Sequence, residues 1–381
     1  MSAVRTRAGE PKESERMTTD PVCKMQVDED RTEHSSRYRD RNYYFCSERC
    51  KREFDENPER YLAPERGSAS ERKVAVVGAG NVGATFAYAL MMSGLANDIP
   101  PIGRTPDKVR AHVMDLNHGM MFVPPTRIYE GSYSDCRNAD LVVVTAGQPQ
   151  KPGETRLDLA SKNTEIFRKL IPEIARYNPR NLLIVTNPVD ILTHAAIKFS
   201  GMTMNRVIGS GTVLDTARFR YLLSSHCGVS PRNVHAYILG EHGDSEVPIW
   251  SNARIGGVPL RRYCPACDRQ CPTGELEEIF SQVKNAAYEI IRGKGSTYYA
   301  VGLALVDITA SILRDESNIL TVSSLVDGFY GIRDVCLSIP VLVNRNGVAK
   351  MVNIRLEEIE AEQLRESADY LKGIISELGI G

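Results

Sequence analysis

A glycine-rich turn, preceded by a strand-like run and followed by a helix-like run, constrains the fold of this chain more than any other feature. Residues 78–83 read GAGNVG, directly after the apolar run VAVV and before an amphipathic stretch. Glycines at this spacing allow a tight turn and the close approach of a pyrophosphate, and the following helix offers free N–H groups to that anion. Glycine-rich turns are common, but the flanking strand and helix favour a dinucleotide-binding unit.

Strand-like runs alternate with helix-like stretches beyond this turn. Three runs are short, rich in Val, Ile and Leu, and bounded by Gly, Asn or Pro: 73–77, 141–145 and 182–186. The second half adds a run at 233–239, helical stretches at 275–293 and 296–313, strand-like runs near 318–323 and 338–344, and a final helix at 357–378. Such alternation predicts an α/β protein, with a doubly wound parallel Rossmann sheet followed by an α+β catalytic domain.

Composition divides the chain into five segments. A charged tail precedes a segment that is dense in Tyr, Arg and Cys, and a linker bearing Pro, Gly and Ser follows. The alternating α/β pattern occupies the rest. We expect a disordered tail at residues 1–17, a small Cys-containing module at 18–63 and a linker at 64–71. A dinucleotide-binding domain at 72–212 and a substrate-binding catalytic domain at 213–381 follow.

Charge and apolar content exclude several kinds of function. The chain has 47 Lys and Arg against 48 Asp and Glu, a net charge of −1, which argues against broad capture of nucleic acid or an anionic membrane. A bilayer-spanning run of about 18 apolar residues is missing, and the first 17 residues lack the apolar core of a secretory signal. Nine cysteines, an odd number, suggest thiols or metal ligands in a reducing cytoplasm.

The second strand of the dinucleotide unit departs from the usual pattern. An acidic residue about 20 residues after the turn normally holds the adenosine ribose. Gly103 stands at that position, and Pro100 and Pro101 precede it. Because a proline lacks a backbone donor, we expect this strand to pair poorly. Three interpretations stay open: Gly103 followed by Arg104 favours the 2′-phosphate of NADP, or ribose binding is weakened, or the damage is local and leaves the other cofactor contacts intact.

Three polar stretches carry the residues expected to do chemistry. Arg156 follows the strand-like run LVVVTAG within a polar loop, Asp215 and Arg218 open a helix, and His242 closes a strand. Three residues apart, Asp215 and Arg218 share one helix face. A carboxylate beside His242 would fix its tautomer and favour its charged form, and a guanidinium binds a substrate carboxylate through two hydrogen bonds. A lone histidine is more often structural, but this combination favours catalysis.

Longer stretches of the sequence share one resemblance. They read VVGAGNVGATFAYALM, MDLNHG, KPGETRLDL, TNPVDILT, GSGTVLDTARFR, LGEHGDSEVP and NRNG. On these stretches, residues 72–381 resemble the bacterial L-lactate dehydrogenases of the lactate/malate dehydrogenase family. The resemblance implies reversible hydride transfer between NAD(H) and pyruvate or L-lactate.

The resemblance also implies roles for individual residues. His242 would donate and accept the proton, Asp215 would orient it, and Arg156 would polarise the reacting carbonyl when the loop 148–157 closes. Malate dehydrogenases have Arg where this chain has the neutral Gln150, which implies a small neutral substrate side group such as that of pyruvate. Substrate contacts are implied for Gln150, Arg156, Asn187, Arg218 and Thr297. Cofactor contacts are implied for Gly78, Gly80, Asn81, Val82, Gly83, Arg104, Lys108, Tyr133, Gly147, Thr186, Asn187 and Ser210.

Arg220 and His235 predict an allosteric effector site. Arg220 is two residues beyond Arg218, about 200° round the helix, so both cannot face the substrate. The alternative is a solvated arginine and a surface histidine. At the matching positions, bacterial L-lactate dehydrogenases bind fructose 1,6-bisphosphate between subunits, so the resemblance implies this effector and a homotetramer.

The N-terminal module carries a separate signal. Residues 20–62 resemble a YHS domain, a small module often associated with heavy metals, and keep three cysteines: Cys23, Cys46 and Cys50. Three thiolates are one short of the usual four zinc ligands, and His34, Asp20 or water could supply the fourth. The alternative is a thiol-rich core. A segment of this size buries little surface, so zinc or another heavy metal would help it fold.

A second group of cysteines lies before the helix at 275–293 and comprises Cys264, Cys267 and Cys271. The sequence shows no fourth ligand beside them, so we favour a variable loop over a metal site. The remaining cysteines are interpreted as ordinary buried thiols: Cys136, Cys227 and Cys336.

The resemblance makes a cytoplasmic L-lactate dehydrogenase with a metal-associated N-terminal module the leading hypothesis. One rival is a malate-type enzyme, against which Gln150 argues. Another is a metal-binding or sensory protein with an impaired dehydrogenase domain. The two prolines and Gly103 suggest that rival, and the intact set of Arg156, Asp215, Arg218 and His242 opposes it.

Overall fold

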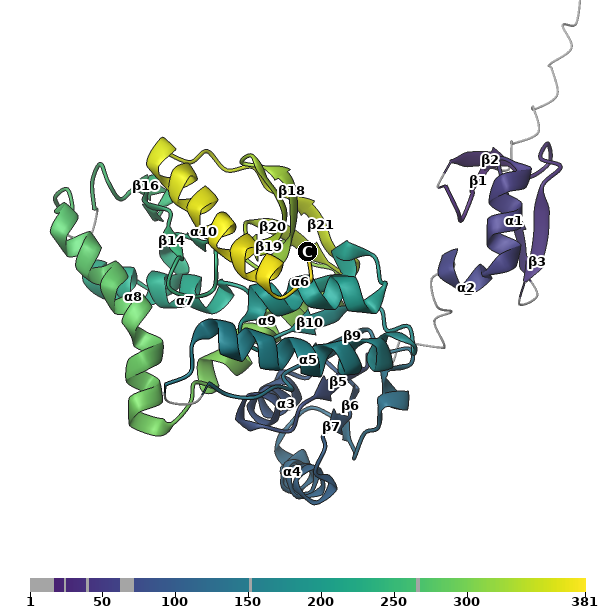
Figure 1. Ribbon diagram of the computed structural model, residues 1–381, viewed down its shortest axis with the longest axis horizontal. Helices are drawn as coiled ribbons and strands as arrows, with labels where there is room; N and C mark the ends of the chain where they lie inside the picture. The colour runs from purple at the N-terminus through teal and green to yellow at the C-terminus, as the bar shows by residue number, and fades with distance from the viewer. Residues whose placement is uncertain (1–16, 24, 39–40, 62–71, 151–152, 265–267) are drawn as a thin grey trace, which may run out of the picture. The chain divides into compact units, whose positions relative to one another are not determined.

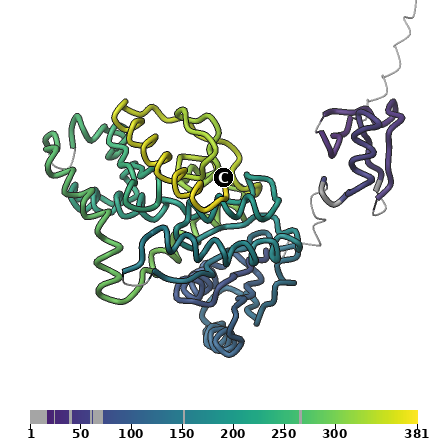
Figure 2. The backbone as a smooth tube through the Cα atoms, in the orientation of Figure 1, coloured from purple at the N-terminus to yellow at the C-terminus, as the bar shows by residue number. Residues whose placement is uncertain are grey.

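The computed structural model describes residues 17–381 except 24, 39–40, 62–71, 151–152 and 265–267. The chain divides into two compact units, Met1–Ser70 and Glu71–Gly381 (Figures 1 and 2). The predicted linker and all but the last residue of the predicted tail lie outside the described residues. That last residue, Met17, begins a strand, so the tail prediction is wrong there. In the described part of the chain, no helix combines the length and the apolar character that crossing a bilayer requires.

The described residues of the first unit form two antiparallel strand pairs and two helices: β1 (Met17–Thr19) with β2 (Gln26–Asp28), β3 (Ser35–Tyr38) with β4 (Arg41–Tyr44), α1 (Glu48–Glu56) and α2 (Pro58–Tyr61). Ser47 caps α1, because its side chain accepts a hydrogen bond from the Cys50 N–H. The buried core is small and consists of Phe45, Cys50 and Phe54, with Tyr38 edge-on to Phe54. A core of this size contributes little stability by itself.

A seven-stranded sheet forms the centre of the second unit, in the order β19-β18-β11-β10-β9-β5-β7. Five of its strands are parallel: β5 (Val74–Val77), β7 (Pro101–Ile102), β9 (Leu141–Val144), β10 (Leu182–Ile184) and β11 (Val207–Gly209). Two strands from the second half of the chain extend the sheet in antiparallel pairing, β18 (Ser323–Phe329) and β19 (Ile332–Ser338). The predicted doubly wound Rossmann sheet is confirmed. Its extension by β18 and β19 was not predicted from the sequence.

Strand β5 shows why the apolar runs form central strands. All four of its side chains are buried. Val74 and Val76 belong to the core on one face of the sheet, with residues of α3 (Asn81–Ser93), and Val77 belongs to the core on the other face, with residues of α5 (Arg156–Ala175). Because alternate residues of a strand point to opposite faces, a continuous apolar run fits a strand that is covered on both sides.

The strand order reverses at β5, which lies between β7 and β9. The chain crosses from β5 to β7 through α3 and then returns to the other side of β5 as β9. Ligands of open α/β sheets bind in the crevice at the carboxyl ends of the strands, at such a switch point. The glycine turn 78–83 follows β5 directly and therefore lies at this position.

The remaining elements complete the second unit. The other helices are α4 (Pro106–His118), α6 (Val189–Ser200), α7 (Val213–Cys227), α8 (Thr273–Lys294), α9 (Tyr299–Arg314) and α10 (Glu358–Glu377). Short strands form small sheets: β6 (Asp98–Ile99) with β8 (Arg127–Ile128), β12 (Val234–His235) with β15 (Arg254–Ile255) and β16 (Val258–Pro259), β13 (Ile238–Leu239) with β14 (Val247–Pro248), and β17 (Asn318–Leu320) with β20 (Val341–Asn344) and β21 (Gly347–Met351). Helix α10 packs on β19 and α6 (Figure 1).

The strand that contains the two prolines is split but paired. It forms β6 and β7 on either side of Pro100. The Pro100 carbonyl accepts a hydrogen bond from the Val76 N–H at 3.1 Å, and the Pro101 carbonyl accepts one from the Gly131 N–H at 2.9 Å. The expectation of poor pairing is wrong for this edge of the sheet, because a proline without an N–H still offers its carbonyl as an acceptor.

Candidate functional site

The glycine turn brings the start of α3 against the end of β5. Gly78 has a φ of 120°, and a Cβ atom there would lie 2.5 Å from Thr145 Oγ1. A Cβ atom on Gly83 would lie 1.9 Å from the Gly78 carbonyl oxygen, so both positions require glycine. Gly80 caps α3 and has open space where its Cβ would be. The turn therefore fits a pyrophosphate, which can approach the backbone at Gly80 and the N–H groups of the first helical turn.

Asn81 and Val82 occupy that first turn. Asn81 Nδ2 donates a hydrogen bond to the Ser296 hydroxyl at 3.1 Å, which links the glycine turn to the segment before α9. Val82 is half-buried against the core. Ser296 precedes Thr297, a predicted substrate contact, so this hydrogen bond couples the predicted cofactor turn to the predicted substrate pocket.

Gly103 is exposed just beyond β7, at the position where an acidic residue was expected. A Cβ atom there would lie 2.8 Å from Val109 Cγ2 and 3.2 Å from Ala79 Cβ. A side chain at position 103 therefore requires the Val109 side chain of α4, or the backbone beside it, to give way. Arg104 and Lys108 are both exposed beside it, at the start of α4.

Asn163 of α5 joins the loops that follow β9 and β10. Its Oδ1 accepts a hydrogen bond from the Gln148 N–H at 2.8 Å, and its Nδ2 donates one to the Asn187 carbonyl at 2.8 Å. Gly147 lies against it, and a Cβ there would lie 2.2 Å from Thr186 Cγ2. Asn163 is fully buried and was not predicted; the only signal was a polar residue on the apolar face of α5.

Ser210 and Tyr133 complete the predicted cofactor contacts. Ser210 follows β11 and donates its N–H to the Ile184 carbonyl at 2.8 Å. Tyr133 is half-buried in the short 3-10 helix Tyr133–Cys136. Apart from Tyr133 and the α3 and α4 residues, the predicted contacts thus follow the carboxyl ends of parallel strands, as the switch point requires.

Asp215, Arg218 and His242 meet at one point. Asp215 lies in the first turn of α7 and is buried. Its Oδ1 accepts a hydrogen bond from Arg218 Nη1 at 2.8 Å, and its Oδ2 contacts His242 Nδ1. The structure therefore brings together the three residues that the sequence predicted as neighbours, and Nε2 is the ring nitrogen of His242 left to exchange a proton.

Charges around His242 determine its protonation. Burial alone lowers the pKa of His242, but the carboxylates of Asp215, Asp190 and Glu246 raise it to about 9. Burial raises the pKa of Asp215, but His242 and Arg218 outweigh that effect and hold it below its ordinary value. The pair is therefore an imidazolium and a carboxylate at neutral pH.

Three buried carboxylates around His242 were not predicted as site residues. Asp190 Oδ2 accepts a hydrogen bond from the His242 N–H at 2.8 Å, and burial raises the pKa of Asp190 to about 6. Burial and the charge of Asp215 raise the pKa of Glu246 to about 8. Glu241 is fully buried and pairs with Arg156. The only sequence feature that could have pointed to these carboxylates is that they lie in the stretches TNPVD and GEHGDSE.

Arg156 contacts the His242 segment directly. Its Nη2 donates to the His242 carbonyl at 2.8 Å and lies 2.6 Å from Glu241 Oε1. Gln150 is exposed and donates from Nε2 to the Glu154 carbonyl at 2.9 Å. Arg156 therefore lies beside the catalytic segment, whereas Gln150 contacts its own loop. Residues 151 and 152 of this loop lie outside the described residues.

Arg218 and Thr297 line one cavity of about 840 Å³, together with Leu214 and Tyr298. The structure thus places two predicted substrate contacts, from α7 and from the segment before α9, on the wall of the same space. Arg218 belongs both to this wall and to the Asp215 cluster, so a carboxylate bound in the cavity could pair with the guanidinium that also contacts Asp215.

Arg220 contacts the residue that follows His235, and the two predicted effector residues have different settings. Arg220 Nε donates to the Ala236 carbonyl at 2.9 Å, and its guanidinium stacks on the Tyr237 ring at 5.4 Å. Burial lowers the pKa of Arg220. His235 is exposed, one residue from that carbonyl. Arg220 is thus not the solvated arginine of the alternative interpretation.

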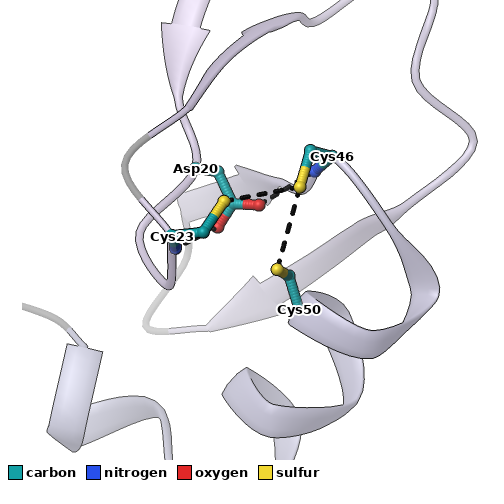
Figure 3. Close-up of side chains that lie close together, drawn as sticks. All are labelled: Asp20, Cys23, Cys46 and Cys50. Atoms are coloured by element: carbon teal, nitrogen blue, oxygen red, sulfur yellow. Dashed lines mark hydrogen bonds between the residues drawn. The ribbon is translucent and has the colours of Figure 1, made fainter.

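The N-terminal unit holds a cluster of possible metal ligands: Asp20, Cys23, Cys46 and Cys50, whose ligand atoms all lie within 4.8 Å of one another (Figure 3). Cys46 Sγ lies 3.4 Å from Cys23 Sγ and 3.8 Å from Cys50 Sγ. Asp20 accepts hydrogen bonds from the N–H groups of Cys23 and Cys46, at 3.3 and 2.9 Å, and so fixes both cysteine loops. His34, the other predicted fourth ligand, instead lies 3.2 Å from the Glu48 carboxylate.

The cluster is unfavourable for ionised thiols without a cation. The neighbouring Cys23 thiol and the Asp20 carboxylate raise the pKa of the Cys46 thiol to about 12. A soft divalent cation would compensate the negative charge and take the thiolates as ligands. The residues present therefore fit zinc or another thiophilic metal.

Fold and site together define a nucleotide-binding α/β enzyme of the dehydrogenase class, with a glycine turn at the switch point and a buried acid–base pair at the start of α7. Comparison with known families agrees: residues 72–209 match the NAD binding domain of lactate/malate dehydrogenases, and residues 212–379 match their alpha/beta C-terminal domain. The chain belongs to the lactate/malate dehydrogenase family. Residues 18–65 match the YHS domain.

Relatives named L-lactate dehydrogenase are similar over most of their length. An L-lactate dehydrogenase of Acetivibrio thermocellus is 56% identical over 310 residues, which cover 81% of this chain and 98% of the relative. An L-lactate dehydrogenase of Thermoanaerobacterium saccharolyticum is 51% identical and covers 81% of this chain and 99% of the relative.

Solved structures share the fold. A lactate dehydrogenase from a Medee basin deep-sea metagenome library superposes with a TM-score of 0.77 at 43% identity, covering 81% of this chain and 99% of that one. The minor L-lactate dehydrogenase of Enterococcus mundtii gives a TM-score of 0.78 at 39% identity, covering 80% of this chain and 98% of that one.

Proposed function

We propose that this protein is an NAD-dependent L-lactate dehydrogenase that interconverts pyruvate and L-lactate in the cytoplasm. The observation that carries this proposal is the contact of His242 with Asp215, and of Asp215 with Arg218, in a chain whose glycine turn fits a dinucleotide. Relatives named L-lactate dehydrogenase at 51–56% identity support the same reaction.

Residues of this chain would transfer the proton and hold the substrate in position. Bound NAD(H) supplies or accepts the hydride. Protonated His242 donates its Nε2 proton to the carbonyl oxygen of pyruvate, and Asp215 stabilises the imidazolium before this transfer. Arg218 binds the substrate carboxylate through two hydrogen bonds. Arg156, beside the His242 carbonyl, stabilises the charge that develops on the substrate oxygen.

Gln150 supports pyruvate over a dicarboxylic substrate. A second substrate carboxylate needs a cationic partner, and the amide of Gln150 carries no charge. We therefore propose that oxaloacetate is a poor substrate, which separates this enzyme from the malate-type rival.

A steady-state assay of pyruvate reduction with NADH and with NADPH tests the function and the cofactor together. We expect turnover with NADH, and weaker discrimination against NADPH than an acidic residue at position 103 would give. Gly103→Asp is expected to penalise NADPH, because its carboxylate repels the 2′-phosphate. Oxaloacetate serves as the competing substrate, and an enzyme that prefers it would contradict the proposal.

Gly103→Ala is the matched control for this variant. Both substitutions place a Cβ atom 2.8 Å from Val109 Cγ2, so both crowd the Val109 side chain in the same way. The difference in NADH affinity between Asp and Ala therefore reports the carboxylate alone, and we expect tenfold tighter binding or more, from roughly 1.5–3 kcal/mol per charge-assisted hydrogen bond. Equal affinities would show that the geometry of this strand, and not the missing side chain, limits cofactor binding.

We also propose that fructose 1,6-bisphosphate activates a homotetramer through Arg220 and His235. The contact of Arg220 with the Ala236 carbonyl, one residue from His235, supports this, because a guanidinium and an imidazole together suit a phosphate. We expect the effector to lower the KM for pyruvate and to favour the tetramer in sedimentation, and Arg220→Gln to abolish both responses. Kinetics and sedimentation that do not respond to the ligand would exclude the effector site.

For the N-terminal unit we propose a bound zinc ion or another thiophilic metal, held by Cys23, Cys46 and Cys50. The four converging ligand atoms of Figure 3 carry this proposal. A full chain with Ser at the three cysteine positions is expected to lose about one equivalent of zinc relative to the parent, measured by elemental analysis after loading and desalting. Unchanged zinc content would exclude the site.

A further inference from the structure

The short segment 295–298, between the end of α8 and the start of α9, touches both the glycine turn and the cavity that Arg218 lines. Asn81, the first residue of α3, donates from Nδ2 to the Ser296 hydroxyl at 3.1 Å, across 215 positions of the chain. The next residue, Thr297, lines the cavity together with Arg218, whereas Ser296 is not part of the cavity wall. Two consecutive residues therefore contact two different parts of the site.

The segment is held at both of its ends. Gly295 ends α8 with a φ of 85°, which lies in the left-handed region that favours glycine. Tyr298 occupies the capping position of α9, and the Lys294 ammonium lies 3.2 Å from the centre of its ring, which is a cation–π contact. Only Ser296 and Thr297 lie between these two fixed residues. A change in the position of Ser296 is therefore passed on to Thr297.

Helix α9 packs closely on α3, the helix that begins at the glycine turn. A Cβ atom at Gly302 of α9 would lie 3.1 Å from Thr85 Cγ2 and 3.4 Å from the Thr85 carbonyl oxygen, so the missing side chain lets the two helices approach. Thr85 lies four residues after Asn81, which is about one helical turn. The hydrogen bond between Asn81 and Ser296 thus extends a close helix pair to the segment that lines the cavity.

Asn81 can serve the cofactor and this segment at the same time, because it uses different groups for each. The first N–H groups of a helix have no partner within the helix and suit a pyrophosphate, and the backbone N–H of Asn81 is one of them. Its side-chain amide is the group that binds Ser296. A pyrophosphate bound at the first turn of α3 would therefore fix Asn81 and, through its amide, Ser296.

We propose that Ser296 is a positioning residue: through its hydrogen bond to Asn81, a dinucleotide bound at the glycine turn fixes Thr297 in the cavity and favours binding of the substrate there. The inference rests on the proposed dehydrogenase function, because it needs a dinucleotide and a substrate at these two places. Ser296 acts through Thr297 and touches no reacting atom. Since coupling between two binding sites is reciprocal, the substrate tightens the dinucleotide by the same factor.

The test measures this factor in the full chain as the ratio of two dissociation constants for NADH, without and with saturating oxamate. Oxamate has an amide nitrogen where pyruvate has a methyl carbon, so it fills the same space but is a poor hydride acceptor. Ser296→Ala is expected to lower the ratio about 2- to 10-fold, the effect of one net hydrogen bond. The dissociation constant for NADH alone should stay within about twofold, because the backbone of the glycine turn is unchanged. A general loss of structure would instead weaken NADH binding in both conditions.

Ser281→Ala is the matched control. The Ser281 hydroxyl also accepts a hydrogen bond from an asparagine side chain, Asn285 Nδ2 at 3.3 Å, but both residues belong to α8, so this bond joins no two elements. The control should keep the parental ratio. In an Asn81→Ala background, where the bond is already lost, Ser296→Ala should lower the ratio no further.

The outcomes separate this inference from the proposed function. In an enzyme that reduces pyruvate, an unchanged ratio in Ser296→Ala would overturn the inference and leave the proposed function intact. A further decrease by Ser296→Ala in the Asn81→Ala background would also overturn it, because the effect would then not pass through the hydrogen bond between the two side chains. A parent that binds NADH but neither reduces pyruvate nor binds oxamate would contradict the proposed function, and the inference with it.

Discussion

His242→Gln is expected to lower kcat for pyruvate reduction by about 10²–10⁴-fold, because the proton that reaches the substrate oxygen comes from this imidazole. Glutamine keeps a polar side chain of similar size but cannot donate a proton near neutral pH. The dissociation constant for NADH should stay nearly constant, since His242 belongs to the proton-transfer cluster and the glycine turn that fits the cofactor is untouched. Stopped-flow turnover and NADH fluorescence titration measure the two quantities separately.

His118→Gln serves as the control for this variant. His118 is an exposed residue at the end of α4, and its substitution should leave kcat within about twofold. A His242→Gln enzyme that retains a tenth or more of the parental turnover would remove His242 from the mechanism. Loss of NADH binding in the same variant would indicate a structural role instead.

The features that could be predicted from the sequence are those that depend on residues close together in the chain. Each central strand is a continuous apolar run, and the glycine turn places its own strand and helix, so β5, β9 and β10 could be located within about two residues. Asp215 and Arg218 are three residues apart on one helix, and helical geometry alone makes them neighbours.

Features that depend on contacts distant in sequence could not be predicted in this way. β18 and β19 join the Rossmann sheet through a pairing of Gly209 with Ser323, and no local pattern indicates it. Pro100 suggested poor pairing, whereas the register needs only its carbonyl on the side facing β5. Cys227 lies 37 residues before Cys264, so no local spacing rule predicts that their sulfur atoms lie 3.1 Å apart.

The carboxylates around His242 show what the structure adds to the predicted triad. The sequence predicted one partner, Asp215, and the fold adds Asp190 and Glu246. Asp215 and Asp190 oppose the effect of burial, so the imidazole remains charged at neutral pH, where an isolated buried histidine would be neutral and where Glu246, with a pKa of about 8, is mostly protonated. The protonated form that pyruvate reduction requires is thus the form that the resting site favours.

Asp215→Asn is therefore expected to change the pH profile as well as the rate. Burial lowers the pKa of His242, and Asp215 is the largest of the charges that raise it to about 9. In the parent, kcat/KM for pyruvate reduction should be level below this pH and fall above it, while kcat/KM for lactate oxidation, which needs neutral His242, should rise toward pH 9. Without the Asp215 charge the burial effect remains, so the midpoint of both profiles should move to lower pH.

The rate at neutral pH should also fall in Asp215→Asn, by about 10²-fold or more, because less His242 is protonated and its tautomer is no longer fixed. Glu246→Gln is the comparison variant, because Glu246 makes a smaller contribution to the pKa of His242 and no hydrogen bond to its ring. The midpoint of its pH profile should therefore shift less than that of Asp215→Asn. Steady-state profiles in both directions between pH 5 and about 10 measure the shifts. An Asp215→Asn enzyme with an unchanged midpoint would show that another group sets the pH dependence, and an equal shift in both variants would assign it to the total negative charge of the site and not to the contact between Asp215 and His242.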